Sequence, residues 1–320
     1  MKASRLLPLL LIVALALPWF FDGRGYVLRI ACMVLLFAAM AQSWNIVGGL
    51  ANQISLGHAA FFGVGAYTST ILLLQFGLSP WLGLIAGAGV AMALAFLIAI
   101  PTLKLAGHYF ALATLAFAEV MRILANSSDK LTGGPLGLSV PLVRDASFWQ
   151  LQFGSNFSYY YVFLGLFSFV TLVFWYIKVS AFGYRLRAVR QNSDAAEVAG
   201  VDTYRTKRKA LMISAALMAV CGSLFAQFNF FFDPDSVFGL VNISVRVALI
   251  AIIGGIGTIA GPLLGALFLL PLEEYIDITL AHSAAGLSQF IYAMILILMI
   301  LIRPTGFVSF FRGKKWSWMK

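Results

Sequence analysis

Long apolar runs recur along the whole chain and constrain its fold more than any other feature of the sequence. Each run has about 20 residues, which is the length a helix needs to cross the ~30 Å hydrocarbon layer of a bilayer. Charged residues make up only 11% of the chain, whereas a soluble domain has about 25%. So few charges could not cover a soluble core with polar groups. The sequence therefore predicts a polytopic membrane protein.

The spanning segments are expected to be helices. Lipid offers no partners for backbone N–H and C=O groups, so only helices and closed barrels cross a membrane, and the alternating segments of ~10 residues that mark barrel strands are absent from the sequence. We expect an all-α, single transmembrane domain over residues 1–320 with about ten segments, of which the eighth and ninth could form one broken element. Their ranges are 6–21, 26–47, 54–76, 81–103, 105–125, 158–177, 210–232, 241–258, 260–280 and 286–302.

Basic residues are distributed unequally between the two sides of these segments. With the N-terminus in the cytoplasm, 16 of the 22 basic residues fall on the cytoplasmic side. The positive-inside rule then predicts that both termini are cytoplasmic, and it explains the net charge of +10 without a nucleic-acid partner. Leu6–Phe21 also resembles a signal peptide, but an uncleaved first span agrees better with the many spans that follow.

Two outer loops are long. Residues 126–157 form an external loop that could fold into a small cap, and residues 270–285 carry an acidic patch that includes Glu273. Simple solvated connections explain both loops equally well.

Arg246 stands just inside the eighth span, and its candidate partners are the acidic outer loop and a sister subunit. Glu119 and Arg122, spaced i, i+3, are expected to pair with each other.

The most charged stretch is RLRAVRQNSDAAEVAGVDTYRTKRK at residues 185–209, which holds seven basic residues. It is longer than a connection requires, and it is predicted to be a cytoplasmic loop with a short helix. Ser193 is expected to cap that helix, with acids in its first turn opposing the positive end of the helix dipole. Gly200 would end it in the left-handed conformation.

One face of this short helix is expected to be flat, because Ala195 and Ala196 are both small. With Arg187 and Arg190 beside it, such a helix suits docking into a groove on a soluble partner. An anchor lying on anionic membrane lipid is the alternative. That alternative accounts for the arginines but not for the alanine pair or Gly200.

Asp194-Ala195-Ala196, followed after three residues by Gly200, resembles the EAA loop of ATP-binding-cassette importer permeases, with Asp in place of Glu. Five stretches, in order along the chain, resemble the branched-chain amino acid permease family and specifically the LivM-type half of its permease pair. They are NQISLGHAAFFGVGAY (52–67), AVRQNSDAAEVAGV (188–201), GGIGTIAGPLLGA (254–266), LPLEEY (270–275) and RPTGF (303–307).

The resemblance implies an ABC importer permease fold in a bacterial inner membrane, with branched-chain, hydrophobic amino acids as substrates. It implies four kinds of partner: a LivH-like sister permease subunit, which need not be identical to this chain, two ATPase subunits, an external substrate-binding protein and membrane lipid. Residues 185–209 would be the coupling loop that fits into a cleft on an ATPase. The residues implied in this coupling are Arg187, Arg190, Asp194, Ala195, Ala196 and Gly200.

The sequence contains no G-x-x-x-x-G-K-[ST] phosphate loop. ATP would therefore be used by partner subunits, and we expect this chain to have no catalytic residues, cofactor or metal. Cys32 and Cys221 lie in apolar runs without metal-ligand spacing. A urea or short-chain amide importer is the nearest alternative. A self-sufficient secondary transporter would want ionisable residues in several spans, and these are scarce.

Glycine-rich interruptions occur at corresponding places in the two halves, at Gly48-Gly49 and at Gly254–Gly257. Paired interruptions of this kind point to an internal repeat and to the substrate site of a transporter. The four-residue spacing of Gly257, Gly261 and Gly265 gives a stripe that is expected mainly to pack helices.

The first interruption also carries polar groups, which are tolerated at membrane depth where they line a cavity or face another subunit. A broken helix exposes N–H groups and a positive dipole end, which suit a passing carboxylate. A hydrogen bond from His58 to another helix is equally consistent with the sequence. The residues expected to border the substrate pathway are Ser55, Gly57, His58, Phe61 and Phe62.

Overall fold

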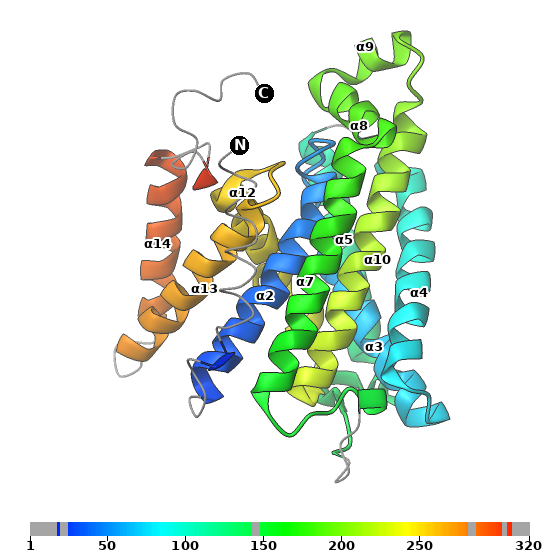
Figure 1. The fold of residues 1–320 in the computed structure, drawn as a ribbon. Helices are drawn as coiled ribbons and strands as arrows, with labels where there is room; N and C mark the ends of the chain where they lie inside the picture. The colour runs from blue at the N-terminus through cyan, green and yellow to red at the C-terminus, as the bar shows by residue number, and fades with distance from the viewer. Residues whose placement is uncertain are drawn as a thin grey trace.

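The computed structural model describes residues 18–19, 25–105, 107–142, 148–280, 286–302 and 306–308. This part of the chain is a bundle of long helices with short elements at both ends (Figure 1). The first predicted span, 6–21, lies outside the described residues apart from positions 18 and 19. The other nine predicted spans all fall on helices, which confirms an all-α polytopic fold.

Six helices in the described ranges are long and apolar enough to cross a membrane. They are α2 (Gly25–Val47), α3 (His58–Phe76), α4 (Pro80–Thr102), α5 (His108–Ser127), α7 (Asn156–Val179) and α10 (Thr203–Asn229). The last of these begins seven residues before its predicted start, at 210, because the Asp202 carboxylate accepts a hydrogen bond from the Arg205 N–H at 2.8 Å and caps the helix.

The C-terminal part of the bundle is built from shorter pieces. These are the π-helix η3 (Leu240–Val245), α12 (Arg246–Gly255), α13 (Gly261–Thr279) and α14 (Leu287–Ile302). Residues 256–260 separate α12 from α13, and the two helices pack against each other through glycines: a Cβ on Gly265 would lie 2.1 Å from the Ile250 carbonyl. The eighth and ninth predicted segments are therefore two packed helices, not one broken span.

The predicted outer loop folds over one end of the bundle. It contains α6 (Asp129–Thr132), η1 (Gly134–Leu136), β1 (Leu138–Ser139) and η2 (Phe148–Gln150). The strand β1 pairs in antiparallel register with β2 (Phe231–Phe232), which follows α10, and β2 leads into α11 (Pro234–Phe238). The described part of 126–157 is thus a structured cap and not a simple solvated connection. A cap was one of the two alternatives that the sequence left open.

The helix α2 occupies the centre of the fold, with α12, α13 and α14 on one side and the remaining long helices on the other (Figure 1). On that second side α3 and α10 approach so closely that glycine is required. A Cβ on Gly65 would lie 2.0 Å from the Ala219 carbonyl, and one on Gly222 would lie 1.9 Å from the Phe62 carbonyl. Small residues allow this backbone contact between membrane helices.

Candidate functional site

The predicted coupling loop forms two helices, α8 (Ala181–Gln191) and α9 (Ser193–Val198), which project from the end of the bundle opposite the cap (Figure 1). The N-cap of α9 is Asn192, whose side chain accepts a hydrogen bond from the Ala195 N–H at 3.0 Å. The prediction of Ser193 as the cap is wrong by one residue, because both residue types cap helices and Asn192 takes the extended conformation that the cap needs.

The alanine pair does not form one exposed face. Ala196 is buried with 5% of its surface exposed, whereas Ala195 and Asp194 are exposed. Beside them Val198 is 91% exposed, the most exposed large apolar residue of the described chain. Gly200 adopts φ +85° and closes the helix by donating to the Glu197 carbonyl at 2.9 Å. The sequence interpretation missed Val198, because a single apolar residue in a charged loop carries no periodicity.

The two arginines of α8 have different roles. Arg187 donates to the carbonyls of Gly183 and Lys178 and stacks on the Tyr184 ring at 4.3 Å, so it stabilises the loop itself. Arg190 instead reaches another part of the chain: its Nη1 donates to the Gly49 carbonyl at 2.7 Å. The predicted coupling loop therefore touches the first glycine interruption directly.

The two interruptions meet at this place. The Asn45 side chain accepts from the Gly257 N–H at 2.7 Å and donates to the Thr258 carbonyl at 3.0 Å. Lys178 Nζ donates to the Gly257 carbonyl at 2.8 Å. We call Asn45, Gly49, Lys178, Arg190 and Gly257 the glycine junction. Gly257 adopts φ +74° in the loop before α13, so it is not part of the helical stripe that the sequence predicted, and of the three glycines only Gly261 and Gly265 lie on α13.

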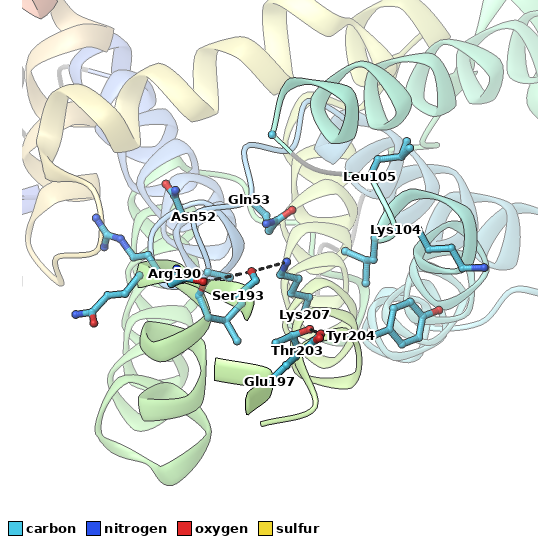
Figure 2. Close-up of a pocket in the computed structure, with 16 residues that line it drawn as sticks. Asn52, Gln53, Lys104, Leu105, Arg190, Ser193, Glu197, Thr203, Tyr204 and Lys207 are labelled. Atoms are coloured by element: carbon cyan, nitrogen blue, oxygen red, sulfur yellow. Dashed lines mark hydrogen bonds between the residues drawn. The ribbon is translucent and has the colours of Figure 1, made fainter. Parts of the chain in front are cut away.

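A pocket of about 520 Å³ opens beside the glycine junction (Figure 2). The end of the first interruption, the α4–α5 turn, α8, α9 and the start of α10 all contribute to its wall. Lys207 donates to the Ser193 hydroxyl at 3.2 Å across this pocket. Asn52, at the wall, adopts φ 54°, a conformation that asparagine tolerates better than most residues.

His58 lies at the first turn of α3 and is fully buried. Its Nε2 lies 2.8 Å from the Ser214 hydroxyl of α10, and its Nδ1 lies 3.0 Å from the Ser55 hydroxyl. The Ser214 hydroxyl donates its single proton to the Ser43 carbonyl of α2 at 2.7 Å. Ser214 must then accept from Nε2–H, so Nδ1 accepts from Ser55. His58 thereby joins α2, α3 and α10, as the hydrogen-bonding alternative expects.

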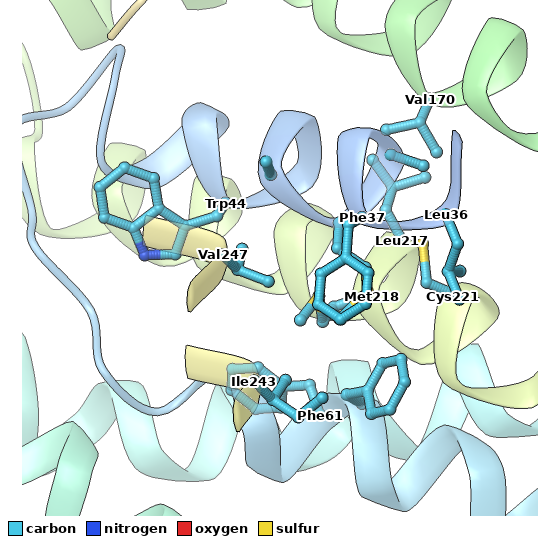
Figure 3. Close-up of a cluster of buried hydrophobic side chains, with 14 of the residues drawn as sticks. Leu36, Phe37, Trp44, Phe61, Val170, Leu217, Met218, Cys221, Ile243 and Val247 are labelled. Atoms are coloured by element: carbon cyan, nitrogen blue, oxygen red, sulfur yellow. The ribbon is translucent and has the colours of Figure 1, made fainter. Parts of the chain in front are cut away.

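The other predicted pathway residues are packed inside the same subunit. Phe61 lies beside Ile243 in the buried apolar cluster that Figure 3 shows, and its ring meets His58 edge-on at 5.8 Å. Phe62 packs on Phe225 at 5.2 Å. A Cβ on Gly57 would lie 2.7 Å from the Thr114 carbonyl. All of these residues are buried within the chain's own fold, so their role in the pathway stays a prediction.

The π-helix η3 contacts the N-terminus of α3 next to His58. The Ser244 hydroxyl of η3 accepts a hydrogen bond from the Ala59 N–H at 2.9 Å, at the N-terminus of α3. A π-helix is rare and is frequently found at functional sites. Neither Ser214 nor Ser244 was singled out from the sequence, because serines in apolar helices are common and their partners lie more than 150 positions away.

The structure identifies the partner of Arg246. Its Nη2 donates to the Glu273 carboxylate of α13, and its guanidinium lies over the Phe37 ring at 4.5 Å. The sequence placed Glu273 in an outer loop, but it lies within a helix. The expected pair of Glu119 and Arg122 is confirmed, and Arg122 also reaches Asp235 of α11.

Comparisons with known proteins agree on one family. The family model described as a permease component of the branched-chain amino acid transport system matches residues 26–302. The high-affinity branched-chain amino acid transport system permease protein LivM of Salmonella typhimurium is 30% identical over 97% of this chain and 76% of its own length, and LivM of Escherichia coli is 29% identical over the same shares.

The LivH permease protein of Escherichia coli is also similar, with 25% identity over 85% of this chain and 91% of its own. No solved structure matches the chain significantly. Residues 26–302 contain the glycine junction and both projecting helices. The chain belongs to the permease family of branched-chain amino acid transport systems.

Proposed function

We propose that this chain is the transmembrane permease subunit of an ATP-driven importer that moves branched-chain amino acids across a bacterial inner membrane. The single observation that carries the ATP-driven part is the projecting pair α8–α9, which presents Val198 to solvent and whose Arg190 donates to the Gly49 carbonyl in the glycine junction. A short helix with one exposed apolar side chain suits a groove on a soluble protein.

The substrate class is supported by the relatives LivM and LivH, whose names state branched-chain amino acid transport. No observation on this chain favours urea or short amides. A secondary transporter would leave the projecting helix without a role. The partners are a LivH-like permease subunit, two ATPase subunits that bind and hydrolyse the ATP, an external binding protein and the surrounding lipid.

The orientation follows from the distribution of basic residues. The α8–α9 end lies in the cytoplasm together with both termini, and the cap of residues 126–157 faces the external side. The basic residues of α8 and of the first turns of α10 then lie where the positive-inside rule puts them.

Reconstitution tests the proposal. The chain, its LivH-like partner and the two ATPases are placed in proteoliposomes, with ATP on the side of α9 and the binding protein on the side of the cap. We expect leucine uptake that requires ATP and the binding protein, and competition by valine and isoleucine but not by urea or acetamide. Uptake without the ATPases, or a preference for urea, would refute the proposal.

A further inference from the structure

The two cations of the glycine junction come from one corner of the chain. Lys178 lies in the last turn of α7 and Arg190 in the last turn of α8. Between them the Ser180 hydroxyl accepts from the Gly183 N–H at 3.3 Å and caps α8. Arg187 donates back to the Lys178 carbonyl at 3.3 Å. The corner is therefore internally bonded, and α8 moves with the end of α7.

The acceptors follow the preceding helices at the same distance in the sequence. Gly49 follows the last residue of α2, Val47, and Gly257 follows the last residue of α12, Gly255. Carbonyls at the C-terminus of a helix lack partners within that helix and carry the negative end of its dipole. A cationic donor at the Gly49 carbonyl is thus favourable, whereas the Gly257 carbonyl lies in the loop after the extended residue Ile256. The two bonds, of 2.7 and 2.8 Å, are both charge-assisted.

The two acceptors also touch each other. A Cβ on Gly49 would lie 2.8 Å from the Gly257 nitrogen, and a Cβ on Gly257 would lie 3.1 Å from Arg190 Nη1. The Asn45 side chain bonds the loop of Gly257 to the last turn of α2. Neither interruption can shift along the other without breaking at least one of these bonds.

We propose that Arg190 and Lys178 are positioning residues through which α8–α9 controls both interrupted helices at once. A displacement of α9 by a docked ATPase would pull on the carbonyls of Gly49 and Gly257 together, so that the adjoining ends of α2 and α12 move as one unit. This inference rests on the proposed function, and it assigns to two named cations the task of converting movement of the coupling helix into movement of both helices.

The experiment uses the complete reconstituted transporter and compares leucine imported with ATP hydrolysed. Arg190→Gln and Lys178→Gln each remove one charged donor. We expect the ratio of import to hydrolysis to fall by about tenfold, since each variant loses one charge-assisted hydrogen bond, while the complex still assembles and hydrolyses ATP. Arg190→Lys keeps a cationic donor and should recover part of the ratio.

Arg205→Gln is the matched control. Arg205 is a basic residue of the same 185–209 stretch, but it is exposed and pairs with Asp202 on its own helical turn. Its removal should leave the ratio unchanged. The double variant Arg190→Gln/Lys178→Gln should be no worse than the more severe single variant, because both cations act on one junction.

The outcomes separate the inference from the proposed function. A wild-type complex without ATP-dependent import refutes the proposed function. A working wild-type complex whose Arg190→Gln and Lys178→Gln variants keep the normal ratio refutes the inference alone. If the Arg190→Gln subunit does not assemble, a normal ratio in both Arg190→Lys and Lys178→Gln refutes it equally.

Discussion

His58 and Ser214 stand 156 positions apart in the chain, yet His58 Nε2 lies 2.8 Å from the Ser214 hydroxyl in the centre of the bundle. Because the Ser214 hydroxyl donates its single proton to the Ser43 carbonyl, the imidazole must be the donor in the contact between His58 and Ser214. The histidine of the first interruption is therefore held in one tautomer by helices on both sides of it.

Replacing His58 by Ala should lower stability, because Ser214 then loses a donor in a buried site, at a cost of about 1–3 kcal/mol. We expect a lower melting temperature of the purified subunit and a several-fold slower leucine uptake, with unchanged affinity of the external binding protein. His108→Ala is the control, since His108 is exposed. A normal melting temperature for His58→Ala would contradict the structural role.

Gly222→Ala should prevent α3 and α10 from packing. The added methyl group would lie 1.9 Å from the Phe62 carbonyl, which is backbone and cannot move aside, and overpacking of this kind typically costs about 1–3 kcal/mol or more. Gly165→Ala on α7, where a Cβ meets open space, should be neutral. The yield and the melting temperature of each variant in detergent measure the effect. Equal values for Gly222→Ala and Gly165→Ala would argue against the α3–α10 contact.

Val198→Asp should weaken binding of the ATPase subunits while the permease still inserts into the membrane, because a carboxylate would have to be desolvated in the groove that receives Val198. Ala195→Glu, on the exposed surface, should act in the same way. Leu136→Asp changes another highly exposed apolar residue, on the cap, and should not affect ATPase binding. Pull-down of the ATPases with each variant measures the effect, and retention by Val198→Asp would exclude this docking face.

Cysteines placed at Val198 and at Leu136 should be labelled from opposite sides of the membrane. The two native cysteines, Cys32 and Cys221, are buried and give little background. A membrane-impermeant maleimide should reach position 198 only from the cytoplasm and position 136 only from outside. Labelling of both positions from one side would overturn the orientation.

The sequence predicted the spans well because apolar run length depends directly on membrane thickness. The prediction of helix bounds was wrong where the first turns of a helix contain charged residues. The start of α10 was missed because Arg205 to Lys209 interrupt the apolar run, although Arg208 lies over the Phe96 ring at 4.9 Å and keeps its charge at the rim of the bundle.

Contacts between residues far apart in the chain could not be predicted from the sequence. Arg190 and Gly49 are 141 positions apart, and nothing local distinguishes an arginine that reaches another helix from one that stabilises its own loop, as Arg187 does. The neighbouring cap residues Asn192 and Ser193 present the same difficulty, because propensity alone does not choose between two good caps. The pathway residues around His58 were predicted from polarity. Polarity alone does not distinguish side chains that line a substrate pathway from side chains that bond to neighbouring helices.

The central place of α2 has a consequence for biogenesis. This helix leaves the ribosome first among those described, but the helices that enclose it, α7, α10, α12 and α13, are made more than a hundred residues later. It must therefore enter the bilayer before the four helices that enclose it are present. Its composition permits this: the helix is apolar around its whole circumference between Arg29, in its second turn, and the polar residues Gln42, Ser43 and Asn45, in its last turns. The helix at the centre of the finished protein is thus one whose composition lets it remain in the membrane before its neighbours are synthesised.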